Sequence, residues 1–385
     1  MASISSPTML GLLHLVAVFL TFSTAHSVLD CYTSIFSFGD SLADTGNSIR
    51  ESKNAQFVGH FPYGETYFHR PTGRFSDGRL IVDFIAQELG LPYLPPYLGS
   101  SSDRDFHRGV NFAVGGATAL DAAFFQERGI RNELTNNSLG IQLRWFKDLL
   151  PSLCPNPPDC GDIFRRSVFL VGEIGGNDYN YPFLQRRSLE EIRTLVPLVI
   201  NSIGSTVDTL IKYGARTLVV PGNLPIGCSA AYLTVLESPR GEDYDPRTGC
   251  LTYLNEFSNY HNRKLLQELD RLRALHPNAT IIYADYFNAA MGFYRSPRHF
   301  GFYGGAITAC CGGGGPYNYN TSAKCGYQGA TMCDNASSHV AWDGVHLTEA
   351  AYRWIADGLI RGPFFSPSIE TPCLSLGSRD HSYYE

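Results

Sequence analysis

The sequence has little charge of either sign and no excess of positive charge. Only 17% of its 385 residues are charged, and 30 Lys and Arg stand against 36 Asp and Glu, for a formal net charge of −6. A chain without a basic surplus has no general attraction for phosphate backbones, so this balance argues against nucleic acid as a partner. With 44% hydrophobic residues, the composition is that of a globular protein rather than a disordered, collagen-like or coiled-coil chain.

Several motifs that carry chemistry are also missing. The sequence has no C-x-x-C pair and no H-E-x-x-H, which argues against a metal centre. It has no Walker P-loop and no G-x-G-x-x-G fingerprint, so no nucleotide cofactor is expected. The G-x-S-x-G elbow of α/β-hydrolases is absent as well, so a serine nucleophile would have to belong to another class. No long internal repeat is visible, which disfavours solenoids and propellers.

A short apolar run near the N-terminus has the features of a secretory signal. Residues 9–20 form an apolar stretch that is shorter than the ~20 residues needed to span a bilayer, and small residues follow it. No later segment looks apolar enough for a membrane helix. The sequence therefore predicts a cleaved signal over residues 1–27 and a single domain over residues 28–385. It also predicts a monomer that is secreted or vacuolar.

The cysteines and the glycosylation motifs fit the same compartment. All 10 cysteines lie beyond the predicted signal, and an even number is typical of disulfide-bonded secreted proteins. Pairs that are close in sequence are candidate bridges, such as Cys154 with Cys160 and Cys325 with Cys333, although the sequence does not determine the connectivity. N-glycosylation is predicted at four sequons, namely Asn136, Asn278, Asn320 and Asn335.

Short β-branched or aromatic runs alternate with helical patterns along the chain. The clearest predicted strands are Ser34–Phe38, Ser167–Val171, Thr217–Val220 and Thr280–Ala284. Helices are predicted over residues 80–89, in a long stretch that opens at Ser188 with Glu191 as a capping box, over residues 253–275, and from Thr348 towards residue 362. This alternation predicts an α/β fold, a three-layer sandwich with a mainly parallel sheet, in which ligands bind beyond the carboxyl ends of the strands.

A serine and a distant Asp-His pair are the candidate catalytic residues. Serine becomes a nucleophile when a base removes its proton and fixed donors receive the oxyanion. Ser41 directly follows the first predicted strand, in Gly39-Asp40-Ser41, although a lone serine there is more often a helix cap. Asp343 and His346 stand in a D-x-x-H spacing, which lets the carboxylate hold one imidazole nitrogen while the other faces a serine.

Together, these motifs resemble the GDSL (SGNH) esterase/lipase family of secreted plant enzymes. Four separated blocks agree in order, and these are residues 38–47, 111–118, 175–178 and 343–346. The stretch 61–79 looks like the plant branch of the family, and within it like enzymes that remove small acyl groups from specialised metabolites. The resemblance extends over nearly all of the predicted mature chain.

The resemblance implies a flavodoxin-like sandwich and a specific set of roles. Ser41 would attack an ester carbonyl, His346 would act as general base and then acid, and Asp343 would orient His346. The oxyanion hole would consist of the backbone N–H groups of Ser41 and Gly115 and the side-chain amide of Asn177. The mechanism requires no cofactor and no metal, and the partner would be a small-molecule ester.

Other interpretations remain open at this point. The same triad would serve an acyltransferase, and the esters could be those of a lipase or a polysaccharide O-acetylesterase. A non-catalytic carbohydrate-binding wall protein is the remaining alternative. Asp40 and Asp178 are expected to support their loops by hydrogen bonds rather than to act as catalytic acids. Residues 119–137, with Phe124 and Phe125, could form a wall of the site or an ordinary surface loop.

Overall fold

The structure, a computed structural model, describes residues 32–369 except 52, 100–105, 133 and 155–156. Residues Tyr32–Ile369 form one compact unit. The predicted signal over residues 1–27 lies outside the described residues, as do Cys31 and Cys373. The extent of the domain over residues 28–385 therefore stays a prediction.

A six-stranded sheet forms the centre of this unit. Its strand order is β2-β1-β3-β4-β5-β8, with the first five strands parallel and β8 antiparallel at one edge. The strands are β1 Ser34–Phe38, β2 Gly109–Asn111, β3 Ser167–Val171, β4 Thr217–Pro221, β5 Thr280–Ala284 and β8 Phe365–Ser366. The order 2-1-3-4-5 is that of flavodoxin-like sheets, which confirms the predicted fold class. All four predicted strands are present.

Alternating side chains of the strands divide the core into two parts. In β1, Ile35 packs on one face of the sheet, whereas Phe36 and Phe38 pack on the other. In β3, Val168 and Leu170 share the face of Ile35. Because both faces are buried, β1 and β3 are apolar apart from three serines, of which Ser34 and Ser167 hydrogen-bond to each other at 2.6 Å.

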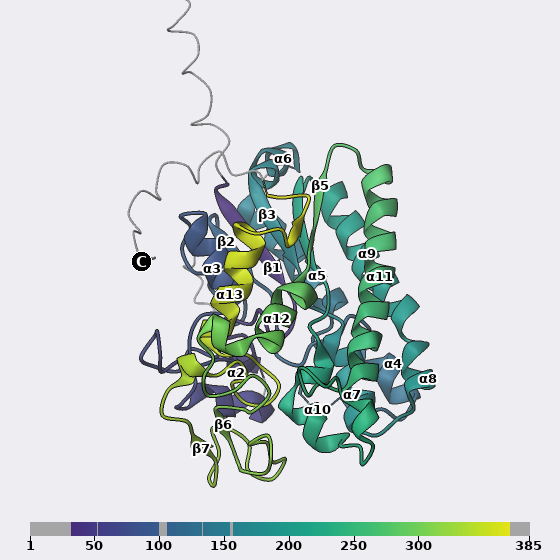
Figure 1. Cartoon of the computed structure of the whole chain (residues 1–385). Helices are drawn as coiled ribbons and strands as arrows, with labels where there is room; N and C mark the ends of the chain where they lie inside the picture. Colours follow the sequence, from purple (N-terminus) through teal and green to yellow (C-terminus); the bar gives the residue numbers. More distant parts are fainter. Residues whose placement is uncertain (1–31, 52, 100–105, 133, 155–156, 370–385) are drawn as a thin grey trace, which may run out of the picture. The chain divides into compact units, whose positions relative to one another are not determined.

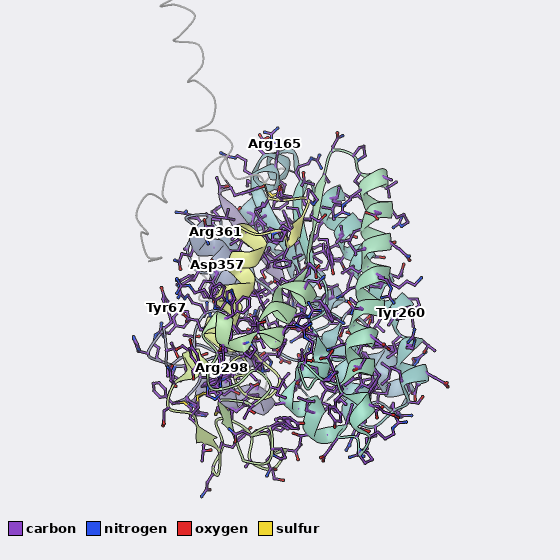
Figure 2. All side chains as sticks on the ribbon, viewed as in Figure 1. Tyr67, Arg165, Tyr260, Arg298, Asp357 and Arg361 are labelled. Atoms are coloured by element: carbon purple, nitrogen blue, oxygen red, sulfur yellow. A yellow bond between two sulfur atoms is a disulfide. The ribbon has the colours of Figure 1, made fainter. Side chains whose placement is uncertain are left out.

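Helices cover both faces of the sheet. The helices α3, α12 and α13 lie over one face, and α9 and α11 lie over the other, where α5 packs against α9 (Figure 1). The bounds are α2 Ser48–Glu51, α3 Ile81–Glu88, α4 Ala122–Glu127, α5 Leu139–Leu153, α6 Pro157–Arg165, α7 Gly176–Leu184, α8 Leu189–Arg193, α9 Val196–Lys212, α10 Ala230–Val235, α11 Thr252–Leu275, α12 Tyr286–Arg295 and α13 Glu349–Ile360. Side chains fill the space between the layers (Figure 2).

The long helix predicted from Ser188 is divided into α8 and α9. Ser188 caps α8, since its side chain accepts a hydrogen bond from the backbone of Glu191 at 3.1 Å. Pro197 stands in the first turn of α9, where its missing N–H is tolerated, and it prevents the helix from running on unbroken. The expectation that no later segment is apolar enough for a membrane helix is wrong by composition, because Leu189–Lys212 is long and apolar enough to cross a membrane. However, 56% of the 18-residue stretch that passes this test is buried inside the unit, as in a core helix. Thr348 caps α13 as predicted.

Disulfides fasten the irregular segments. Cys154 is bonded to Cys160, as predicted. The predicted pair of Cys325 with Cys333 is wrong, because Cys325 is bonded to Cys311 and Cys333 to Cys310. Cys310 directly precedes the short strand β6 (Cys311–Gly312) and Cys311 begins it, and β6 pairs with β7 (Thr331–Met332). A further bridge joins Cys228 to Cys250.

All four predicted glycosylation sites lie on the surface. The side chains of Asn136, Asn278, Asn320 and Asn335 are exposed. Surface exposure is required for glycan attachment, so the sequons stay candidates.

Candidate active site

Ser41, His346 and Asp343 form one hydrogen-bonded row, although 305 residues separate the first two. The Nε2 atom of His346 lies 2.8 Å from Oγ of Ser41, and its Nδ1 atom lies 2.7 Å from Oδ2 of Asp343. The three residues are 8%, 7% and 9% exposed, so all three are largely shielded from solvent and each keeps a small accessible part. The arrangement has the geometry of a nucleophile, a base and an orienting acid.

The loop before α13 fixes the Asp-His pair. Oδ1 of Asp343 accepts the backbone N–H groups of Val345 and His346, at 3.0 and 2.9 Å. Burial raises the pKa of Asp343, but the charge of His346 and the hydrogen bonds from His346 and Tyr63 outweigh burial and lower the pKa to about 2. Asp343 is therefore ionised and can only accept, so Nδ1 of His346 carries a hydrogen and Nε2 is free to take the serine proton.

Ser41 follows β1 at the carboxyl edge of the sheet. Gly39 has φ of +150°, and a Cβ atom there would lie 2.8 Å from the carbonyl oxygen of Glu173. The backbone N–H of Asp40 donates to that same oxygen at 2.9 Å. Only glycine allows the segment after β1 to lie this close to the segment after β3, and this contact places Ser41 at the point where the strand order reverses.

Asn177 comes from the first turn of α7, directly after β3. Its Nδ2 atom donates to the carbonyl oxygen of Ala117 at 3.0 Å and to Oδ2 of Asp40 at 3.2 Å. Burial raises the pKa of Asp40 to about 7. A carboxyl group with so high a pKa is partly protonated near neutral pH, which makes Asp40 a weak competitor for the amide of Asn177.

The two motif aspartates support loops, as predicted. Oδ1 of Asp40 accepts the N–H of Leu42 at 3.0 Å. The carboxyl of Asp178 accepts the N–H groups of Ala119 and Leu120, at 2.8 and 3.0 Å. Asp178 thus joins the start of α7 to the loop after β2.

The prediction that the amide of Gly115 faces the site is wrong. Its N–H donates to Oδ2 of Asp44 at 2.8 Å and to Oγ of Ser48 at 2.6 Å, so it points into the interior. The next residue, Gly116, lines a cavity beside Ser41 and Asn177. Within the part of the chain that the structure describes, the N–H of Gly116 donates to no protein acceptor.

Two cavities meet at Ser41 and His346. The larger is about 890 Å³, and its walls are mainly apolar and aromatic, including Phe57, Tyr63, Phe75, Leu134, Tyr181, Tyr232 and Tyr319. The smaller is about 660 Å³, and Asp40, Glu173 and Ser229 bring polar groups to its wall.

The predicted wall over residues 119–137 contributes little to these cavities. Leu134 is its contribution to the larger cavity, whereas Phe125 is fully buried in the core. Phe124 lies under the guanidinium of Arg128 at 3.6 Å from the ring centroid.

Comparisons with known proteins identify the family of this chain. A family model described as GDSL-like Lipase/Acylhydrolase matches residues 35–359, which include every residue of the triad. The chain belongs to this GDSL family. A GDSL esterase/lipase of Arabidopsis thaliana is 51% identical over 369 residues, which cover 95% of this chain and 93% of that protein. Sinapine esterase of Brassica napus is 50% identical over 353 residues, covering 91% and 90%.

The similarity to these relatives over most of the chain indicates that this member of the GDSL family is a carboxylic ester hydrolase. A second Arabidopsis thaliana GDSL esterase/lipase is 51% identical over 379 residues, or 97% of this chain and 96% of the relative. Among solved structures, an acetyl-xylooligosaccharide esterase from Geobacillus covers 86% of this chain at 13% identity with a TM-score of 0.37, and no feature of the site is inferred from it.

Sequence reasoning missed several residues around Ser41, His346 and Asp343. Tyr63 donates to Asp343, and Phe75 packs its ring against the imidazole of His346, with centroids 4.8 Å apart. Both belong to the stretch that resembled the plant branch, which could have indicated proximity to the site. Asp44, which holds the Gly115 amide, lies within the first motif block but was given no role.

Within the described residues, one cluster of side chains could hold a metal ion by distance. Cys310, Cys333 and His339 have ligand atoms within 4.8 Å of one another. However, Cys310 and Cys333 are bonded to each other, so neither offers a thiolate.

Proposed function

We propose that the protein is a secreted serine esterase that cleaves small acyl esters through an acyl-enzyme on Ser41. The observation that carries the proposal is the row from Ser41 through His346 to Asp343, with its 2.8 and 2.7 Å hydrogen bonds. The two cavities that meet at Ser41 support a substrate with two parts, one on each side of the ester bond.

In the first step, Oγ of Ser41 attacks the ester carbonyl carbon while its proton moves to Nε2 of His346. The imidazole becomes an imidazolium that Asp343 stabilises through Nδ1. As the tetrahedral intermediate collapses, the bond to the alcohol oxygen breaks and the imidazolium returns the proton to that oxygen. The alcohol leaves, and the acyl group stays on Ser41 as an ester.

The oxyanion of this intermediate needs preorganised donors. We assign this role to the N–H groups of Ser41 and Gly116 and to Nδ2 of Asn177, with Gly116 in place of Gly115. Nδ2 of Asn177 would release Asp40 and turn one hydrogen to the oxyanion, which the raised pKa of Asp40 makes easier.

In the second step, water replaces the alcohol. His346 removes a proton from water, the resulting hydroxide adds to the acyl carbon, and the bond to Ser41 breaks as His346 returns the proton to Oγ. The acid is released and the resting enzyme is restored.

The cavities suggest which part of the substrate lies where. The larger cavity contains Gly116 and mostly aromatic walls, so we place a short or aromatic acyl group there. The smaller cavity has the more polar lining, with Asp40, Glu173 and Ser229, which suits a polar alcohol part. These features favour esters of plant specialised metabolites over long-chain lipids.

The compartment and assembly are part of the proposal. The disulfides and the four exposed sequons fit an oxidising, glycosylating compartment, so we propose secretion to the apoplast or vacuole, cleavage of the signal near residue 27 and a monomer. N-terminal sequencing and size-exclusion chromatography of the secreted protein test these points.

The decisive experiment compares wild type and Ser41→Ala on an extract of the source tissue, with the esters that disappear and the acids that appear followed by mass spectrometry. We expect release of acid with wild type alone. The control is Ser205→Ala, an exposed serine on α9, which should behave as wild type. Full turnover by Ser41→Ala would overturn the proposal, and ester formation with an added alcohol would indicate acyl transfer instead.

A further inference from the structure

Tyr63 makes a direct contact with the acid of the triad. Its hydroxyl donates to Oδ2 of Asp343 at 2.8 Å. This is the same oxygen that lies 2.7 Å from Nδ1 of His346, whereas Oδ1 of Asp343 is occupied by two backbone N–H groups. Tyr63 and His346 therefore both hydrogen-bond to the same oxygen of the buried Asp343 carboxylate.

The hydroxyl of Tyr63 is fixed as a donor. The side chain is 1% exposed, and its ring packs edge-on against Trp342 and against Phe57. Burial and then the neighbouring charge of Asp343 raise the pKa of Tyr63 well above its usual value, so the hydroxyl stays protonated. The ring cannot turn away without opening the packing around Trp342.

The same residue lines the larger cavity. Tyr63 stands in its wall together with Phe57 and Phe75, and Phe75 also contacts the imidazole of His346. One side chain thus connects the surface that would receive the acyl group with the acid that holds the base.

We propose that Tyr63 is a positioning residue that acts through Asp343 and sets the basicity of His346. This inference rests on the proposed triad. By donating to Oδ2, Tyr63 withdraws negative charge from the oxygen that stabilises the imidazolium, and it holds the carboxylate in the plane that His346 requires. The bond keeps His346 a base that releases its proton again in the step that expels the alcohol.

Other titratable groups also lie near Asp343 and His346 and contribute to the electrostatic environment of these two residues. Asp40 lies near His346 from the loop after β1, and the charge of His346 lowers the pKa of Asp40 against the larger effect of burial. Tyr319 and Tyr352 face Asp343, and both have raised pKa values, first from burial. Tyr63 differs from these two because it bonds the carboxylate itself.

The test is the pH profile of kcat/KM for Tyr63→Phe, which removes one oxygen and keeps the ring. Without the donor, more negative charge remains on Asp343 and favours the imidazolium. We expect the acid limb of the profile to move to higher pH by roughly half a unit to one unit, and kcat to fall about tenfold with KM little changed. A structural role alone would lower the melting temperature and leave the acid limb in place, which would overturn the inference.

Tyr319→Phe is the matched control. Tyr319 lines the same cavity, but among the described contacts its hydroxyl makes no bond to Asp343, so the acid limb should not move. If Tyr63→Phe folds poorly, replacing Tyr63 by 3-fluorotyrosine tests the same bond while keeping the hydroxyl. In the Asp343→Asn background, adding a 3-fluorotyrosine at position 63 should change kcat less than twofold, whereas in wild type this more acidic donor should move the acid limb to lower pH.

The outcomes separate this inference from the proposed function. If Ser41→Ala retains turnover, the triad itself fails. If Ser41→Ala is inactive but neither Tyr63→Phe nor 3-fluorotyrosine moves the acid limb, the triad stands and the role of Tyr63 is refuted.

Discussion

The carboxylate of Asp44 accepts the backbone amide of Gly115 at 2.8 Å, which joins the loop of the nucleophile to the loop after β2. The same carboxylate accepts the N–H groups of Gly46, Asn47 and Ser48, at 2.7, 2.6 and 3.0 Å, and the hydroxyl of Ser48. Five donors thus converge on one side chain that is fully buried. The position of Gly116 at the site depends on this anchor.

Asp44→Asn should therefore destabilise the fold and slow the reaction. The amide nitrogen of asparagine would face donors, so we expect a loss of about 3 kcal/mol in the free energy of unfolding and a fall in kcat. Urea unfolding measures the first effect. Asp357→Asn is the control, since Asp357 and Arg361 pair on the outer side of α13 (Figure 2), and their exposed bond is worth no more than about 1 kcal/mol. Equal losses in the two variants would contradict the anchor role.

The assignment of Gly116 as an oxyanion donor predicts a specific adduct geometry. In a crystal structure of Ser41 modified by a phosphonate, one phosphonyl oxygen should lie about 2.7–3.1 Å from the N–H of Gly116 and from Nδ2 of Asn177. The amide of Gly115 should remain on Asp44. An adduct in which Gly115 leaves Asp44 and binds the oxygen would restore the prediction made from the sequence.

Asn177→Ala should act on the transition state. Loss of one oxyanion donor costs about 3 kcal/mol, which corresponds to a fall in kcat of roughly 100-fold with little change in KM. The matched control is Asn288→Ala, an exposed asparagine on α12 that should leave both constants unchanged. A rise in KM with an unchanged kcat would show that Asn177 binds the ground state instead.

The strands could be predicted from local patterns, and the candidate residues Ser41, Asp343 and His346 from local motifs together with the resemblance to the GDSL family. The buried parallel strands are continuous apolar runs, and the fold brings their carboxyl ends together, so Ser41 and Asn177 had to be neighbours. The D-x-x-H spacing is a property of one loop, which explains why Asp343 and His346 were found as a pair.

The features that the sequence could not determine depend on contacts between residues that lie far apart in the chain. Gly115 and Gly116 are adjacent and chemically identical, and only the position of Asp44 decides which amide faces inward. The bond from Tyr63 to Asp343 joins residues 280 apart with no pattern in common. The cysteine pairing depends on the pairing of β6 with β7, which places Cys310, just before β6, near Cys333, just after β7, while Cys311 bonds to Cys325.

The disulfide between Cys311 and Cys325 should support substrate binding. Cys325 lines the larger cavity beside Tyr319 and Lys324, so replacing both cysteines by serine should loosen this wall and raise KM several-fold while kcat changes less. The control replaces Cys154 and Cys160, whose bond joins the end of α5 to α6 and whose residues line neither cavity. If both double variants have the same KM as wild type, the bridge has no part in binding.

The buried carboxyl of Asp178 should make the free energy of unfolding fall as pH rises from about 4 to 7. In this range Asp178 is ionised in the unfolded chain but protonated in the folded protein. Burial raises the pKa of Asp178 from 3.8 to about 7, against the N–H groups of Ala119 and Leu120, which lower it. Between these values the folded protein holds a proton that the unfolded chain releases. The stabilisation from this carboxyl is therefore complete below pH 3.8 and is lost towards pH 7, at about 1.4 kcal/mol per pH unit.

Other buried groups also change the free energy of unfolding with pH. Asp40 changes it in the same direction as Asp178, whereas His261, whose pKa burial lowers to about 3, changes it in the opposite direction, so the wild-type curve alone does not identify Asp178. The difference between wild type and Asp178→Asn isolates Asp178. In urea unfolding at pH 4.5 to 6.5, the variant should be less stable at the acid end and approach wild type as pH rises, and parallel curves would show that Asp178 is already ionised in the folded protein.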